Sequence, residues 1–96
     1  GQFGSSIDSV LLIQEHISSP NDIYNLINDI SEILYPFSIQ PQRIEYFADL
    51  ILDGYPSYYW TDTWNNYISS GDDTIVRNKL DLLLKSMINA AENQLM

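Results

Sequence analysis

The chain has 96 residues, of which 45% are hydrophobic and 18% charged, and acidic residues outnumber basic ones by 13 to 4. This apolar content argues against intrinsic disorder, and the length suits one domain with a modest core. A net charge of -9 makes nucleic acid and anionic membranes poor partners, because binding phosphate requires Lys and Arg. A basic protein or a cation suits this charge better. The absence of cysteine excludes disulfides and thiolate metal sites.

The first residues, Gly1-Gln2-Phe3-Gly4, lack an initiator Met and the basic and apolar regions of a signal peptide. We expect residues 1–4 to be a tag remnant or a disordered lead-in. We expect residues 1–96 to form a single helical domain that is the C-terminal module of a longer protein. Ser5 and Ser6 can cap a first helix, with one side formed by Ile7, Val10, Leu11 and Ile17. The apolar run 10–13 is equally compatible with a strand.

The second predicted helix starts at Ser19-Pro20, with Ser19 as its N-cap and Pro20 in the first helical position. Pro36 ends it near Tyr35, because the residue before a proline avoids the helical conformation. Its apolar residues recur in steps of three and four and form one stripe, which consists of Ile23, Leu26, Ile27, Ile30, Ile33 and Leu34.

Two shorter helices are predicted next. The third opens at Ile39-Gln40-Pro41 and presents the stripe Ile44, Phe47, Ala48 and Ile51. Gly54 stands where the left-handed residue that follows many helices is expected. An aromatic turn over 55–59 leads to a fourth helix, which we expect Thr61 to cap and Ser69-Ser70-Gly71 to end. The face of this helix is formed by Trp60, Trp64, Tyr67 and Ile68.

Asp72 or Asp73 caps the last predicted helix, whose stripe comprises Val76, Leu80, Leu83, Leu84, Met87, Ala91 and Leu95. Short connections favour antiparallel packing of consecutive helices. The sequence therefore predicts an all-α fold, a compact bundle of four to five short helices with mostly antiparallel neighbours and a long C-terminal helix. The predicted core contains Ile23, Ile27, Ile30, Leu34, Phe47, Ile51, Trp64, Val76, Leu80, Leu83, Leu84 and Met87.

Little in the sequence supports catalysis. His16 is the only histidine, no G-x-S-x-G elbow surrounds a serine, and the glycines form no phosphate loop. Zinc needs three or four suitable ligands, and calcium a D-x-D-x-D-G loop that is missing here. Asp49 and Asp53 stand one turn apart with Asp62 farther on, but solvated helix faces carry such carboxylates routinely. We expect no enzyme activity, no metal and no cofactor, and His16 on a helix surface.

Asp8-Ser9-Val10 is similar to the Asp-Ser-Leu motif of acyl carrier proteins, which are also small, acidic and helical. In that family the serine carries the cofactor arm and the motif opens the second helix. Here the motif lies at the start of the chain, without a long helix before it. Carrier function is therefore a remote alternative.

Aromatic residues crowd into thirteen positions as Tyr55, Tyr58, Tyr59, Trp60, Trp64 and Tyr67. Large rigid rings anchor protein interfaces and stack on sugars. The two tryptophans, one turn apart, favour a place in the core, whereas adjacent Tyr58 and Tyr59 cannot both point inward on a helix. The candidate contact surface comprises Tyr55, Tyr58, Tyr59, Trp60 and Tyr67.

An ordered series of motifs occupies the second half of the chain: Leu52-Asp53-Gly54, Tyr59-Trp60-Thr61, Trp64-Asn65-Asn66-Tyr67, Val76-Arg77-Asn78-Lys79-Leu80 and Gln94-Leu95-Met96. The series resembles the extreme C-terminal part of a bacterial family called domain of unknown function 1800. Upstream, Ile7-Asp8 and Pro20-Asn21-Asp22 with Leu26-Ile27 also resemble that part of the family. The resemblance therefore covers most of this chain but a small part of a full-length member. It departs at Ala90-Ala91-Glu92-Asn93, where the family has Met-Pro-Glu-aromatic.

The resemblance implies an exported protein, located in the periplasm or outside the cell, and carries over no catalytic residues. We expect a non-catalytic helical interaction or structural module that completes a larger exported bacterial protein of unknown function. Its partner is then the rest of the parent chain or another protein. The alternative is a carbohydrate-binding module that uses the Tyr/Trp cluster at 55–67. We expect no nucleic-acid binding and no membrane span, and exposed aromatic rings also predict a weak homodimer.

Overall fold

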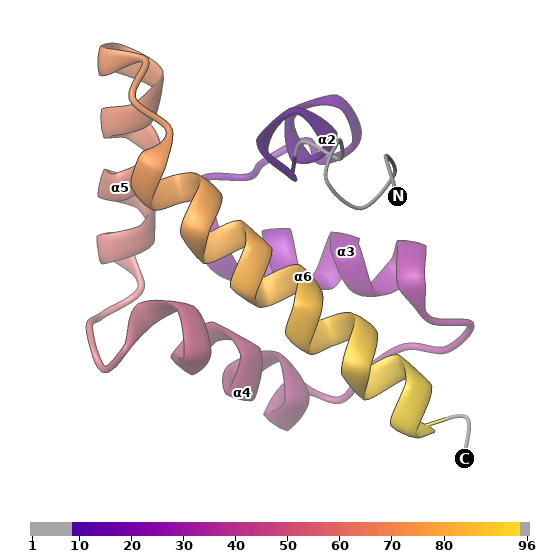
Figure 1. Ribbon diagram of the computed structural model, residues 1–96. Helices are drawn as coiled ribbons and strands as arrows, with labels where there is room; N and C mark the ends of the chain where they lie inside the picture. The colour runs from indigo at the N-terminus through magenta and orange to yellow at the C-terminus, as the bar shows by residue number, and fades with distance from the viewer. Residues whose placement is uncertain (1–8, 95–96) are drawn as a thin grey trace.

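One long helix, α6 (Thr74–Gln94), organises the fold. The computed structural model describes residues 9–94, and the side chains of residues 9–90. In it α6 packs against four other helices, which are α2 (Ser9–His16), α3 (Ile23–Leu34), α4 (Pro41–Leu52) and α5 (Tyr58–Ser70). Figure 1 shows α6 crossing in front of α3, with α2 and α4 on either side of it. This part of the chain contains five helices and no strand, which confirms the predicted all-α bundle with a long C-terminal helix.

The radius of gyration is 13.2 Å, close to the roughly 12.5 Å of a compact domain of this length. Helices α3 and α4 pack together and run in opposite directions, whereas α5 leads away from the end of α4 (Figure 1). None of the described helices is both long and apolar enough to cross a membrane.

The predicted core is largely confirmed. Of the predicted core residues only Leu34 and Leu84 are not fully buried, and both pack against the buried cluster. Among the described side chains, the core also contains eight buried hydrophobic residues outside that list, which are Val10, Ile13, Ile17, Leu26, Tyr35, Ala48, Leu52 and Trp60. The Tyr35 hydroxyl donates a 2.8 Å hydrogen bond to the carbonyl oxygen of Met87, which ties the end of α3 to α6.

The run 10–13 is helical, so the alternative of a strand is wrong. Val10 and Ile13 are buried as expected for one face of a helix, whereas Leu11 is 51% exposed, contrary to the predicted stripe. The predicted caps Ser5 and Ser6 lie outside the described residues, as do Ile7 and the lead-in 1–4.

Two helix starts differ from the prediction. Asp22, and not Ser19, caps α3, because its carboxylate accepts hydrogen bonds from the backbone N–H groups of Tyr24 and Asn25 at 3.0 and 3.4 Å. Helix α5 begins at Tyr58, before the expected cap Thr61. The Thr61 hydroxyl instead donates a 2.7 Å hydrogen bond to the carbonyl oxygen of Asn21, a contact between distant parts of the chain that local patterns do not reveal.

The helix ends follow the glycines more closely. Helix α5 ends at Ser70, within the predicted stretch Ser69-Ser70-Gly71, and its C-cap Gly71 has a left-handed φ of 81°. At the end of α4 the left-handed cap is Asp53, with φ 53°, and Gly54 follows it with φ 88°. Two successive residues with positive φ thus turn the chain towards α5.

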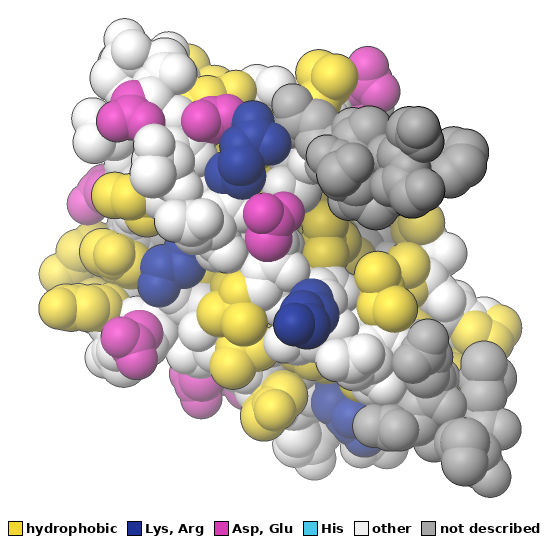
Figure 2. Space-filling model, viewed as in Figure 1, with side chains coloured by type: hydrophobic (Ala, Val, Ile, Leu, Met, Phe, Trp, Pro, Cys, Tyr) yellow, Lys and Arg dark blue, Asp and Glu magenta, His cyan; other side chains and the backbone are white. Residues whose placement is uncertain are grey.

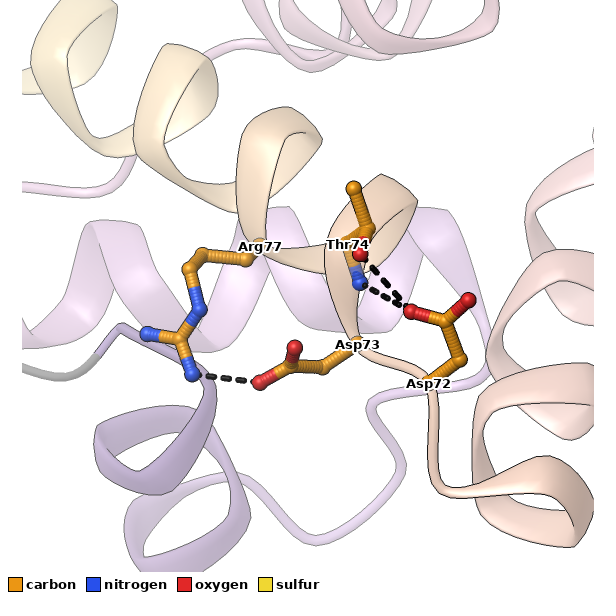
Figure 3. Close-up of polar contacts among 4 residues, drawn as sticks. All are labelled: Asp72, Asp73, Thr74 and Arg77. Carbon is orange, nitrogen blue, oxygen red and sulfur yellow. Dashed lines mark hydrogen bonds and ion pairs between the residues drawn. The ribbon is translucent and has the colours of Figure 1, made fainter.

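Asp72 and Asp73 hold the start of α6 (Figure 3). The Asp72 carboxylate accepts hydrogen bonds from the backbone N–H of Thr74 at 3.1 Å and from its hydroxyl at 2.7 Å. These bonds, the hydroxyl bond first, lower the pKa of Asp72. The Asp73 carboxylate pairs with the guanidinium of Arg77 one turn along the helix. Asp73 directly precedes the helix, and its carbonyl oxygen accepts a hydrogen bond from the N–H of Arg77, so it occupies the N-cap position, while the carboxylate that bonds Thr74 belongs to Asp72.

Two residues of the predicted stripes lie on the surface. Ile33 is 63% exposed and Ile68 is 58% exposed, although both recur at helical spacing with buried neighbours. Each stands at the margin of its stripe, where burial depends on whether another helix packs there. Nothing among the described residues covers either side chain fully.

Candidate functional site

The two tryptophans belong to the core. Trp60 is 1% and Trp64 5% exposed, and their ring centroids are 6.1 Å apart. The indole Nε1–H of Trp60 donates a 2.7 Å hydrogen bond to the carbonyl oxygen of Pro20. The prediction of Trp60 as a contact residue is therefore wrong, because its ring closes the core and its polar edge is already bonded.

The tyrosines divide between core and surface. Tyr58 is 67% and Tyr55 57% exposed, while Tyr59 and Tyr67 are partly buried against the core. The rings of Tyr55 and Tyr59 stack with centroids 4.8 Å apart, and the rings of Tyr67 and Trp64 form a T-shaped pair with centroids 5.3 Å apart. We call Tyr55, Tyr58 and Tyr59 the tyrosine surface. It lies where α4 leads into α5, and Figure 2 shows hydrophobic side chains gathered at this edge of the molecule.

A shallow polar hollow runs along α5 beside the tyrosine surface. It is lined by Tyr59, Asp62, Thr63, Asn65, Asn66 and Ser69. The Thr63 hydroxyl already donates to the carbonyl oxygen of Tyr59 at 2.8 Å. Amide and carboxylate groups next to an aromatic ring are the combination that binds sugars, because hydroxyls pair with the polar groups while the sugar face stacks on the ring.

An apolar cleft of about 200 Å³ lies between α2, α3 and α6. Its lining is aliphatic except for one histidine, and comprises Leu12, Ile13, His16, Ile17, Ile30, Ile33, Leu34 and Leu84. We call it the α2–α3–α6 cleft. The exposed Ile33 stands in its wall, and His16, exposed at the end of α2 as predicted, lines it as well. Sequence patterns did not reveal this cleft, because its walls come from three separate helices.

A larger open hollow of about 780 Å³ lies between the start of α4 and the last turns of α6. Arg43 is its one charged lining residue, among Gln40, Gln42, Tyr46, Phe47, Ser86, Asn89 and Ala90. A second hollow of about 270 Å³ adjoins it and shares Gln40, Arg43 and Ala90. Arg43 is exposed, so its guanidinium is solvated rather than held ready for a ligand.

Basic and acidic residues are distributed unevenly. Arg77, Lys79 and Lys85 belong to α6 and Arg43 lies beside it, so the basic side chains gather on the face drawn in Figure 2. On the outer side of α3 and α4, burial first and then the negative charges of Glu45, Asp49 and Asp22 raise the pKa of Tyr24. This part of the surface is therefore strongly acidic.

The catalytic candidates do not come together in the described part of the chain. The described side chains, those of residues 9–90, contain no cluster of three or more metal-ligating groups. Asp49, Asp53 and Asp62 are exposed. The Ser9 hydroxyl is buried and without a hydrogen-bond partner, which argues against the carrier alternative, because a serine that accepts a cofactor arm has to reach an enzyme.

No protein-family model, no curated protein and no solved structure matches this chain. The resemblance to domain of unknown function 1800 therefore rests on the quoted motifs alone.

Proposed function

We propose that this domain is a non-catalytic helical module that binds another protein, or the rest of a longer parent chain, through the tyrosine surface. The observation that carries the proposal is the exposure of Tyr58 and Tyr55, at 67% and 57%, on a rigid support. Stacking on the half-buried Tyr59 fixes the ring of Tyr55 before any partner arrives. A preformed aromatic face loses little side-chain entropy on binding, which is why tyrosine is frequent among the dominant residues of interfaces.

The motif resemblance supplies the setting of this proposal. On this resemblance we propose that the domain forms the C-terminal end of a larger exported bacterial protein, in the periplasm or outside the cell. In that setting the parent chain is the first partner to test, and weak association between two copies of the domain is the second.

Site-specific photo-crosslinking in the producing cell tests the proposal. A photoreactive phenylalanine at position 58 should crosslink to the parent chain or to one defined partner protein. The control places the same residue at position 14, because Gln14 is also exposed but lies on α2. The same photoreactive residue is also placed at position 55. The absence of a crosslinked product at both positions 55 and 58, or the same crosslinked products from position 14, would contradict the proposal.

A carbohydrate is the second candidate ligand. The stacked pair Tyr55–Tyr59 borders the polar hollow of α5, so an aromatic face and sugar-pairing groups lie side by side. A glycan array tests this candidate, and Asn66→Ala should weaken any binding because Asn66 is exposed in the hollow. Silence across the array, or binding unchanged by Asn66→Ala and Tyr55→Ala, would remove it.

A further inference from the structure

The α2–α3–α6 cleft is an apolar surface separate from the tyrosine surface. Its walls come from α2, α3 and α6, whereas the tyrosine surface lies where α4 leads into α5 (Figure 1). At about 200 Å³ it is smaller than the roughly 300–1,000 Å³ of small-molecule pockets. It therefore suits inserted aliphatic side chains better than a whole small ligand.

The exposed apolar surface continues beyond the cleft along α6. Ile88 lies one turn after Leu84, on the same side of the helix, and is 45% exposed. Leu12 and Ile33, 40% and 63% exposed, form the facing walls on α2 and α3. An elongated apolar groove between helices is the shape that accepts the apolar face of another helix, with anchors spaced by three, four and seven residues.

Charges beside the cleft specify the flanks of such a helix. Glu15 lies one turn from Leu12, and Asp29 one turn from Ile33, so carboxylates border the walls on α2 and α3. Apart from His16, the charge-bearing residues of α2 and α3 are carboxylates, with no Lys or Arg among them.

The α6 wall is mixed in charge. It carries Asp81 with Lys85 one turn on, while Arg77 is paired with Asp73. The α2 and α3 walls, and not the α6 wall, are therefore the ones that favour a basic partner.

We infer that the α2–α3–α6 cleft binds an amphipathic α-helix of a partner protein, with an aliphatic face in the cleft and Lys or Arg along the edge that faces α2 and α3. A second copy of this chain suits the cleft less well, because each copy brings a net charge of -9 to the contact. This inference concerns a different surface and a different ligand from the proposed function, so either can fail without the other.

A designed helical peptide tests the inference. The probe carries leucines on one face and lysines on both flanks, and binding is followed by fluorescence anisotropy and by backbone NMR shifts of the whole domain. We expect saturable binding with shifts concentrated in α2, α3 and the α6 turns around Leu84. We also expect a several-fold loss of affinity when salt rises from about 50 to about 500 mM.

Two control peptides separate the contribution of the charged flanks to binding from that of the continuous apolar face. A peptide with glutamates in place of the lysines should bind at least about tenfold more weakly, and one with the leucines dispersed around the helix should not bind. Equal binding of the lysine and glutamate peptides would overturn the inference, as would the absence of saturable binding.

A matched pair of variants locates the site. Ile33→Ser should weaken the lysine peptide by about tenfold, since it removes an apolar anchor of the wall. Ile68→Ser, which changes an equally exposed isoleucine on α5, should leave the affinity unchanged. Equal effects of the two variants on peptide affinity would contradict the assignment. So would a homodimer that forms through Ile33 and that the lysine peptide does not dissociate. Because both side chains are mostly exposed, both variants should fold.

Discussion

The indole Nε1–H of Trp60 lies 2.7 Å from the carbonyl oxygen of Pro20 and donates a hydrogen bond to it. This bond joins α5 to the turn before α3, across forty positions of sequence. The neighbouring bond from Thr61 to Asn21 reinforces the same junction. The two contacts fix the part of the fold from which the tyrosine surface projects.

Replacing Trp60 by Phe should lower the free energy of unfolding by about 2–3 kcal/mol. The change shrinks a buried ring and leaves the Pro20 carbonyl oxygen without its donor. Trp64→Phe removes a similar ring that does not bond Pro20, and it should destabilise by about 1 kcal/mol less. Urea titration followed by circular dichroism measures both, and equal losses would show that the hydrogen bond contributes nothing.

The buried hydroxyl of Tyr35 should make stability fall in alkali. Burial raises the pKa of Tyr35, against a smaller opposite effect of Arg43, so the neutral phenol is the form that the fold favours. This contribution is complete below the unfolded pKa, near 10, and is lost as the pH rises through the folded pKa.

Tyr35→Phe tests this linkage, since it removes both the bond to Met87 and the titration. It should destabilise by about 1 kcal/mol at pH 7, and its difference from the unsubstituted protein should shrink as the pH passes 10. Unfolding free energies from urea titrations between about pH 7 and 11 give the comparison. Tyr46→Phe, at an exposed position, serves as the control. A difference that stays constant over this range would contradict the prediction.

The Asp72 carboxylate at the start of α6 should stabilise the fold only at pH values at which it is ionised. Hydrogen bonds from Thr74 lower the pKa of Asp72, so its contribution is present above the unfolded pKa and is lost as the pH falls through the folded pKa. Asp72→Ala should lower the melting temperature at pH 7, and Asp72→Asn should lower it less, because asparagine also caps helices. Both differences should narrow near pH 2, and scanning calorimetry at the two pH values would show whether they do.

The two residues with left-handed φ at the ends of α5 and α4 predict opposite effects of substitution on stability. Gly71 has φ 81°, and a Cβ added there meets no atom within 4 Å, so Gly71→Ala should destabilise by about 1 kcal/mol through backbone strain alone. Asp53 adopts φ 53° without being glycine, so Asp53→Gly should be neutral or stabilising by a few tenths of a kcal/mol. Thermal unfolding measures both, and a stabilising Gly71→Ala would refute the argument.

The sequence by itself determined the helices and most of the core. Helical spacing of apolar residues is a local property, and it predicted the buried stripes of α3, α4 and α6 because one face of each helix has to leave water. The stretches Ile39-Gln40-Pro41 and Ser69-Ser70-Gly71 predicted the start of one helix and the end of another for an equally local reason, since proline fixes φ at its own position and glycine accepts a positive φ at its own.

Only the tertiary structure decided which apolar residues at the edges of the helix stripes stay exposed to solvent. Leu34 and Ile33 are neighbours of equal apolar character, yet Leu34 packs against the core and Ile33 stands free in the wall of a cleft. In the same way, the sequence left Trp60 both a core residue by its spacing and a candidate contact residue, and the fold, with the Pro20 carbonyl reaching it from a distant turn, places it in the core. Exposure depends on which helix packs beside a residue, and that choice is made by contacts between segments far apart in the chain.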